Sequence, residues 1–111
     1  MEITVKKDSG ITVVCPNGRI DTSTAKNFEE GVMKLIPDNQ QIIISFSDTS
    51  YISSAGLRVI LVAGKKIASM NGQLALCGMS DKIFEVFKMS GFDKILKIYP
   101  TFEDAKSSFG K

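Results

Sequence analysis

The sequence predicts an α/β domain with a mixed four- to five-stranded sheet and an N-terminal hairpin. Three observations lead to this fold class. Two short β-branched segments, residues 3–6 and 11–15, flank a turn at the start of the chain. Segments with helical and strand periodicity then alternate, which implies parallel strands joined by right-handed crossovers. Residues 42–46 form a continuous apolar run, typical of a central strand covered on both faces.

The first elements can be assigned in order from local patterns. Residues 3–6 alternate apolar and polar side chains, as a half-buried strand does, and residues 8–10 supply a turn. Residues 11–15 are the expected hairpin partner. We expect Pro16-Asn17-Gly18 to interrupt this strand and residues 19–20 to form a short extended piece.

Residues 21–24 are all helix-capping types, and they precede the first predicted helix. Its apolar side chains recur at helical spacing: Ala25, Phe28, Val32, Leu35 and Ile36. Residues 37–39 end it. After the strand over 42–46, residues 47–56 read as a polar loop with two apolar anchors. The second helix, beginning near Ser54, carries a broad apolar surface and ends at Asn71-Gly72, which predicts burial against the sheet.

The C-terminal third contains one more strand and two more helices. Residues 73–77 predict a strand, and Ser80 or Asp81 caps a third helix that closes at Ser90-Gly91. Residues 94–99 alternate again, as a short edge strand or a turn. Residues 100–101 open a last helix, in which Phe102, Ala105 and Phe109 share one face.

Length and composition restrict the function classes. The 111 residues fit one domain over 1–111. Fourteen basic and 12 acidic residues give a net charge of +2, which offers no basis for binding nucleic acid. The chain has no histidine, so hydrolases that depend on histidine are excluded and the commonest metal ligand is absent. We therefore expect no catalytic residues, no metal site, no cofactor and no enzymatic activity.

The cysteines and the hydropathy pattern indicate a cytoplasmic protein. Cys15 and Cys77 lie in apolar runs and read as buried free thiols, which fits a reducing compartment. We see no signal peptide at the N-terminus and no run of about 18 apolar residues that could span a membrane.

The loop over residues 47–56 is the strongest candidate for a functional site. It follows the most apolar strand and precedes the most apolar helix, and in open α/β sheets ligands bind beyond the carboxyl ends of strands. We expect Ser53 or Ser54 to be the N-cap, its hydroxyl accepting a bond from an amide two or three residues later. Free amides at residues 55–57 and the helix dipole would favour an anion there. A phosphoryl group on a cap serine would therefore change the surface charge while the fold survives.

Three segments of the chain resemble one known family. Asp48-Thr49-Ser50-Tyr51-Ile52-Ser53-Ser54-Ala55-Gly56-Leu57-Arg58-Val59-Ile60-Leu61 looks like the signature of STAS-domain anti-sigma factor antagonists. Gly18-Arg19-Ile20-Asp21 resembles the family's element before the first helix, and residues 89–95 resemble the segment after the third helix. The resemblance implies the STAS fold, with helices packed mainly on one face of the sheet, and a bacterial signalling protein that works by partner switching.

The resemblance also implies partners and a modification. In that family the unphosphorylated antagonist binds an anti-sigma factor, which is a serine kinase with a GHKL-type ATP-binding fold, and the sigma factor is released for transcription. The kinase inactivates the antagonist by phosphorylating a serine at the helix start, and a PP2C-type phosphatase restores it. By position this serine is Ser54.

The resemblance extends to partner-binding residues, with two departures from the family pattern. The implied partner-binding set is Asp21, Asp48, Ser53, Ser54, Gly56 and Arg58. Asp21 and Asp48 match family positions near the same end of the domain, although turn and cap chemistry also explains both. The family often has aspartate immediately before the phosphorylated serine, where this chain has Ser53, so Ser53 is a secondary acceptor. Ser45 stands where the family commonly has aspartate or asparagine.

Two alternatives remain open from the sequence. The first keeps the fold and makes the chain a STAS interaction subunit of another complex, either a stressosome-like scaffold or a lipid-transport ABC system. The second is enzymatic, with Ser54 as a nucleophile. It lacks a base, because Lys65 and Lys66 would lie roughly 16 Å along the helix.

Overall fold

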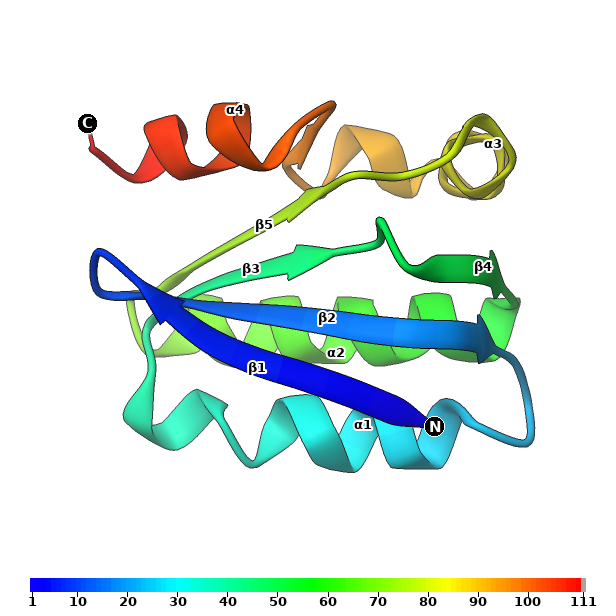
Figure 1. Cartoon of the computed structure of the whole chain (residues 1–111), viewed down its shortest axis with the longest axis horizontal. Coiled ribbons are helices and arrows are strands. Elements are labelled where there is room, and N and C mark those ends of the chain that lie inside the picture. The colour runs from blue at the N-terminus through cyan, green and yellow to red at the C-terminus, as the bar shows by residue number, and fades with distance from the viewer. Residues whose placement is uncertain (111) are drawn as a thin grey trace.

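The computed structural model describes residues 1–110 and shows a six-stranded mixed sheet with helices on both faces (Figure 1). The strands are β1 (Glu2–Asp8), β2 (Ile11–Ile20), β3 (Gln41–Ser45), β4 (Thr49–Ile52), β5 (Gln73–Cys77) and β6 (Ile98–Tyr99). The helices are α1 (Ala25–Met33), α2 (Ser54–Ser69), α3 (Asp81–Ser90) and α4 (Phe102–Ser107). Three short 3₁₀ turns complete the chain: η1 (Ile36–Asp38), η2 (Phe92–Lys94) and η3 (Ser108–Gly110).

The order of the strands confirms the predicted hairpin and the parallel crossovers. Strands lie in the order β1-β2-β3-β5-β6, with β4 pairing β2 beyond the end of β3. β1 and β2 are antiparallel, whereas the β2–β3, β2–β4, β3–β5 and β5–β6 pairs are parallel. Residues 98–99 are thus an edge strand, shorter than the alternation over 94–99 suggested.

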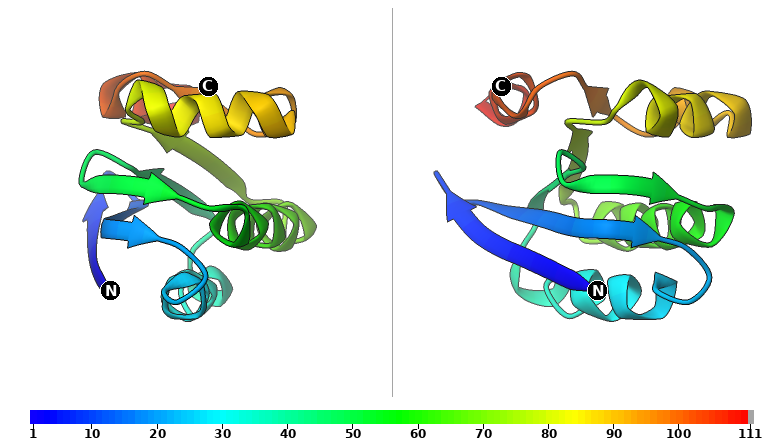
Figure 2. Two further views of the ribbon diagram at one scale, coloured as in Figure 1. Left: turned by 90° about the vertical axis from the view of Figure 1, so that its right-hand side faces the viewer. Right: turned by 45° about the vertical axis from the view of Figure 1, so that its right-hand side comes forward.

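The main core lies on the face of the sheet that α1 and α2 cover, as expected for helices gathered mainly on one face. Phe28 of α1, Ile60 of α2 and Ile44 of β3 are buried in this cluster, and α3 contributes Ile83 and Phe87 to it. A smaller cluster on the other face is covered by α4. In the left view of Figure 2, α1 and α2 lie side by side next to the strands, with α1 the lower of the two, and α3 lies on the far side of β5 from them.

β2 does not stop at Pro16, contrary to the sequence expectation, but runs unbroken from Ile11 to Ile20. Its pairing explains why proline is tolerated. β2 pairs with β3 at residues 12–14 and with β4 from Gly18, so Pro16 lies in the gap between the two parallel partners. The N–H of Gly18 donates to the carbonyl of Asp48 at 3.0 Å, and by alternation the nitrogen of Pro16 faces the same side. No ladder bond is lost there.

Part of the predicted loop over 47–56 is a strand, which raises the strand count from the predicted four or five to six. β4 pairs in parallel with the last residues of β2, with Arg19 opposite Tyr51 and Ile20 opposite Ile52. The two central side chains of β4, Ser50 and Tyr51, are both exposed, so the strand lacks the strict alternation that identifies strands in a sequence. Its order comes from the pairing with β2.

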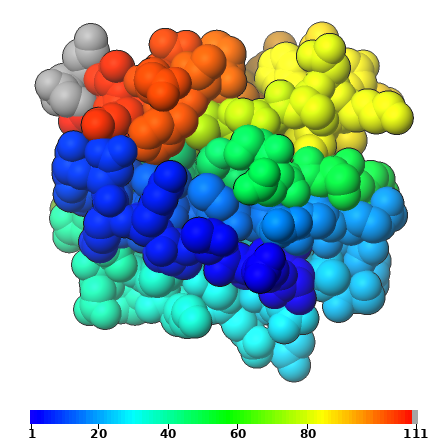
Figure 3. All heavy atoms as spheres, viewed as in Figure 1, coloured from blue at the N-terminus to red at the C-terminus, as the bar shows by residue number. Residues whose placement is uncertain are grey.

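One edge of the sheet is β1, which crosses the front of the molecule between α1 below and α4 above (Figure 3). It carries exposed charged side chains, including Glu2, Lys6 and Lys7, which discourage pairing with another edge strand. Within residues 1–110, no helix has the length and apolar character needed to cross a membrane.

The docking of α3 on the main core generates a stability prediction. Phe87 is fully buried and packs edge-on against Phe46, with ring centroids 6.1 Å apart, whereas Phe84 on the same helix is 37% exposed. Phe87→Ala should lower the free energy of unfolding by about 3–5 kcal/mol, because it removes an aromatic ring from a packed core. Phe84→Ala is the matched control and should cost about 1 kcal/mol or less. Urea denaturation measures both, and equal losses would contradict the observed orientation of α3.

Candidate functional site

The candidate site is built where the end of β2, the end of β4 and the start of α2 meet. The N–H of Ser53 donates to the carbonyl of Ile20 at 2.8 Å, so the residue before α2 continues the pairing of β4 with β2. The N–H of Leu57 then donates to the carbonyl of Ser53 at 3.0 Å, which is the first bond of the helix. The helix start is therefore fixed to the sheet through the backbone and does not depend on any side chain.

Ser53 is the N-cap residue of α2, but its hydroxyl does not cap. Its backbone is extended, with φ −99° and ψ 176°, and no side-chain bond to the first turn is present. The Oγ is buried and has no hydrogen-bond partner within residues 1–110. The sequence expectation of a side-chain cap is therefore wrong for α2, whereas Ser80 caps α3 in the expected way, accepting from the N–H of Ile83 at 3.3 Å.

Ser54 is the first residue of α2, which confirms the helix start predicted near this residue. Its side chain is exposed. The amides of Ser54, Ala55 and Gly56 make no hydrogen bond to any part of the chain that the structure describes. The amide of Leu57, also expected to be free, is used by Ser53. Ser54 therefore lies at the positive end of a 16-residue helix whose first three N–H groups are unpaired within residues 1–110.

Gly56 and Arg58 have separate roles in the first turns of α2. A Cβ on Gly56 would lie 2.7 Å from atoms of both Ile20 and Ile52, so glycine lets the helix pack directly on the ends of β2 and β4. Arg58 lies four residues after Ser54, on the same exposed face of the helix. Arg58 makes no ion pair within residues 1–110, which leaves its charge available to a partner.

Asp21 lies in the turn between β2 and α1, where its carboxylate organises the backbone. It accepts from the hydroxyl of Ser23 at 2.7 Å, from the N–H of Ser23 at 3.0 Å and from Nε of Arg19 at 3.4 Å. The bond from the Ser23 hydroxyl is the main cause that lowers the pKa of Asp21, and the Ser23 amide and Arg19 act in the same direction. Asp21 is thus ionised and engaged in turn chemistry at the same end of β2 as the helix start.

Asp48 lies farther from Ser54 than the sequence indicated. It occupies the turn before β4, whereas Ser53 follows the end of that strand. The two positions are five apart along extended chain, which corresponds to about 16 Å between their Cα atoms. Asp48 is exposed, and its backbone carbonyl rather than its side chain makes the observed bond, to the N–H of Gly18. The structure therefore groups Asp21 with the helix start and leaves Asp48 at the other end of β4.

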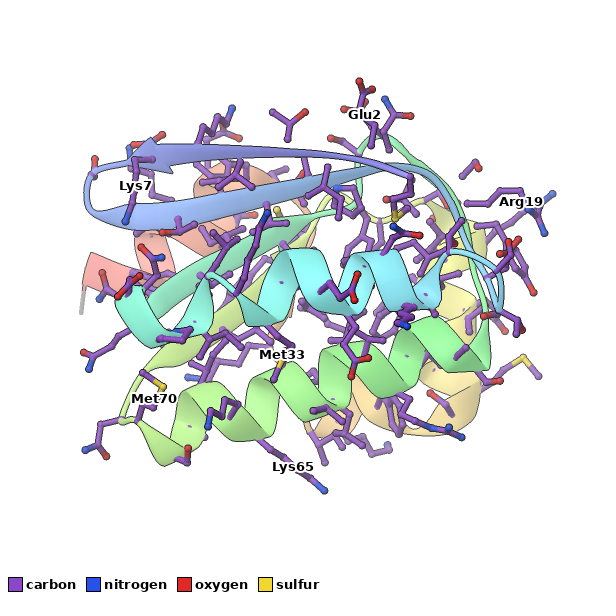
Figure 4. The ribbon with its side chains drawn as sticks, turned by 90° about the horizontal axis from the view of Figure 1, so that it is seen from below. Glu2, Lys7, Arg19, Met33, Lys65 and Met70 are labelled. Carbon is purple, nitrogen blue, oxygen red and sulfur yellow. The ribbon has the colours of Figure 1, made fainter. Side chains whose placement is uncertain are left out.

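One feature beside the site was missed in the sequence. The guanidinium carbon of Arg19 lies 4.3 Å from the centroid of the Tyr51 ring, and Nε of Arg19 also contacts Asp21. Both side chains are exposed, and Figure 4 shows Arg19 projecting at the end of the sheet where α2 begins. Exposed Tyr and Arg side chains are frequent binding hot spots, and stacking holds this pair in place before any partner arrives. This contact could have been predicted from the sequence only by recognising that residues 49–52 form a strand beside residues 18–20.

A groove of about 380 Å³ separates the N-terminal halves of α1 and α2 beside Ser54. Its floor is apolar, with Ala25, Ala55 and Val59, and its rim carries Lys26 and Arg58 together with one acid, Glu29. An apolar floor with mainly positive rim charge suits a partner segment that carries an acidic side chain.

The described residues provide no metal-binding or thiol chemistry at this site. No cluster of three possible metal ligands occurs among residues 1–110. Cys15 and Cys77 form no disulfide, and burial raises the pKa of both thiols, which is the opposite of what an activated thiol requires.

Comparisons of sequence and of structure with known proteins point to the same family. Residues 2–105 match the STAS domain family. BtrV of Bordetella bronchiseptica, named as an anti-sigma factor antagonist, is 31% identical over 98% of this chain and 95% of its own. The anti-sigma F factor antagonist of Paenibacillus polymyxa is 28% identical over 89% of this chain and 86% of its own. A crystal structure from Thermotoga maritima, described as an anti-sigma factor antagonist, superposes with a TM-score of 0.92 at 27% identity, covering 98% of this chain and 95% of that one.

The two N-cap serines generate a paired stability prediction. Ser53→Ala should change the free energy of unfolding by no more than about 0.5 kcal/mol, because the buried hydroxyl it removes has no hydrogen-bond partner. Ser80→Ala should cost about 1 kcal/mol, because it removes a side-chain cap that is present. Chemical denaturation of both variants provides the measurement. A loss at Ser53 as large as that at Ser80 would show that the Ser53 hydroxyl makes a bond in solution.

Proposed function

The chain belongs to the STAS domain family, and on that premise we propose that it is an anti-sigma factor antagonist switched by phosphorylation of Ser54. The unphosphorylated form binds an anti-sigma factor, a serine kinase of the GHKL type, and so releases the sigma factor. Phosphorylation by that kinase ends the binding, and a PP2C-type phosphatase reverses it. The observation that carries the proposal is an exposed serine at the first position of a long helix whose leading amides are unpaired.

The different environments of the two serines support Ser54 as the acceptor. A kinase must reach the hydroxyl oxygen, and the side chain of Ser54 is exposed while the Oγ of Ser53 is buried. Transfer to Ser53 would also place a dianion where α2 packs on β2 and β4, at a high cost in desolvation. Ser53 therefore supports the helix start, and Ser54 carries the modification.

The local charges support a switch that changes binding without unfolding the domain. A phosphoryl group adds nearly two negative charges at pH 7, and the N-terminus of α2 tolerates them through its dipole and unpaired amides. The same charges would offset the positive potential of Lys26 and Arg58 on the rim of the adjacent groove. An acidic partner segment that binds the unmodified surface would then be repelled.

The proposed role is that of a binding module and kinase substrate in the cytoplasm, not of an enzyme. Ser54 has no histidine to act as its base, since the sequence contains none. Partner-contacting residues in this proposal are Asp21, Ser54 and Arg58, with Asp48 at the periphery of the surface. Of the residues that the family resemblance implied, Ser53 and Gly56 act indirectly, by holding the start of α2 on β2 and β4.

The site of modification can be tested by phosphopeptide mapping. Incubation with ATP and a GHKL-type serine kinase from the same genome should add one phosphoryl group, and it should map to Ser54. Ser54→Ala should abolish the added mass, whereas Ser53→Ala should leave it in place. A phosphoryl group on Ser53 would overturn the assignment of the acceptor. Absence of modification by every such kinase, each shown to be active on another substrate, would overturn the switch itself.

The electrostatic part can be tested by calorimetric titration with the anti-sigma factor. Ser54→Asp should weaken binding by at least about tenfold, because it places a negative charge at the centre of the contact surface. Ser54→Ala should bind within about threefold of the unmodified protein, since it adds no charge. Ser107→Asp, an exposed position on α4, is the matched control for the charge change and should have no effect. Equal affinities for Ser54→Asp and Ser54→Ala would contradict this account.

A further inference from the structure

The outer edge of β5 is only partly covered. In the parallel pair with β3, the N–H of Gln73 donates to Gln40 and the carbonyl of Cys77 accepts from Phe46, so residues 73, 75 and 77 bond toward β3. By alternation, Leu74 and Leu76 point their backbone groups the other way. The N–H of Leu76 is used, donating to the carbonyl of Lys97 at 2.9 Å. β6 begins pairing only at Leu76, and within residues 1–110 the backbone of Leu74 has no partner on that side.

A groove of about 250 Å³ is lined in part by Leu74 and its neighbour Gln73. One wall is the C-terminal half of α2, and the other is the segment over residues 95–97 that leads into β6. Its apolar lining includes Leu61, Leu96 and Ile95, and Ile95 is 64% exposed. An exposed isoleucine beside unpaired strand backbone offers an added strand both an apolar contact and a template for pairing.

The charges around this groove are of one sign. Lys65 and Lys97 line it, and no acidic residue does. Lys65 projects from the flank of α2 that faces away from α1 (Figure 4). An occupant that matches this lining must present apolar side chains toward Leu61 and Ile95 and carboxylates toward the two lysines.

We propose that this groove docks an extended, acidic segment of a partner protein, which adds a strand to the edge of β5 at Leu74. Backbone bonds to Leu74 supply the register, alternate apolar side chains enter the groove, and flanking acids pair with Lys65 and Lys97. A second copy of this chain fits poorly, because a symmetric contact would place the same lysines against each other.

This surface is separate from the one that carries the proposed function. Ser54 and Gly64 are ten residues apart on α2, or about 15 Å along the helix axis. The groove opens on the flank of α2 away from α1, whereas the groove beside Ser54 lies between the two helices. Docking there does not require the phosphorylation state of Ser54 to change, so the two proposals fail independently.

Amide hydrogen exchange tests the uncovered edge without any ligand. In the unliganded protein, the amide of Leu74 should exchange at least about tenfold faster than those of Ala75 and Leu76, since only Leu74 lacks an acceptor. Comparable protection at all three positions, independent of protein concentration, would mean that the edge is already covered. Protection of Leu74 that rises with protein concentration would identify a second copy as the occupant. Either result would overturn the proposal.

The occupant's chemistry is tested with the capped peptide Asp-Glu-Val-Thr-Leu-Thr-Asp-Glu, which alternates apolar and polar side chains and has acidic ends. Nuclear magnetic resonance titration at low salt should give saturable binding with Kd below about 1 mM. Shifts should concentrate at Leu74 and residues 95–97, and the amide of Leu74 should become protected. A counterpart with lysine at all four acidic positions should bind at least about tenfold more weakly.

Matched variants separate the groove from general charge effects. Lys65→Glu with Lys97→Glu should weaken binding of the acidic peptide by about fivefold or more. Ile95→Ser should weaken it by a similar factor, because it removes an apolar contact. Lys6→Glu with Lys82→Glu makes the same charge change at exposed sites elsewhere and should weaken it less than twofold. No binding, equal binding of the two peptides, binding without protection of Leu74, or equal losses in the two double variants would each overturn the proposal.

Discussion

The bond between the N–H of Ser53 and the carbonyl of Ile20 is the constraint on which the functional end of this domain depends. It joins the start of α2 to the end of β2, at a point that β3 does not reach. β2 must therefore extend beyond its first parallel partner, and β4 provides a second one. Because Gly56 has no Cβ, the first turn of α2 can lie directly on the side chains that end these two strands. Helix position and strand pairing are thus set together.

This arrangement separates two adjacent serines into different roles. Ser53 belongs to the backbone connection and holds its hydroxyl in a buried position, whereas Ser54 presents its hydroxyl to solvent. Burying the Oγ of Ser53 without a hydrogen-bond partner costs folding free energy. The family often has aspartate at this position. Since no bond from the Ser54 side chain helps to fix the helix start, we expect a charge added at Ser54 to act on the surface and not on the fold. A binding switch of this kind needs a rigid host whose surface potential can change sharply.

The two ends of α2 offer surfaces of different kinds. At its N-terminus, the groove beside α1 and the stacked pair of Arg19 and Tyr51 give a preorganised, mixed surface around a single modifiable hydroxyl. Along its C-terminal half, the groove beside β5 combines exposed apolar side chains with unpaired backbone and lysines. The net charge of +2 conceals this distribution, because acidic residues are absent from the lining of the second groove. Only surfaces that lie apart in this way would let one chain bind two partners at the same time.

Features that depend on nearest neighbours along the chain were determined by the sequence alone. The hairpin, the apolar central strand, the cap at residue 80 or 81, and the helix starts near Ser54 and at residues 100–101 all follow from local periodicity and turn chemistry. The family resemblance, which the STAS family match over residues 2–105 confirms, also needed only residue order. These properties are local because a capping side chain or an amphipathic stripe acts over a few residues.

Features that depend on which strands become neighbours were decided by the tertiary structure. β4 is ordered by β2 and not by its own pattern, and β2 tolerates Pro16 only because its partner changes there. The stacking of Arg19 on Tyr51 joins residues 32 positions apart in sequence, through a parallel pairing that no local pattern encodes. The unpaired backbone of Leu74 likewise exists only because β6 begins two residues too late to cover it. Long-range hydrogen bonding sets each of these features, so side-chain periodicity along the chain could not reveal them.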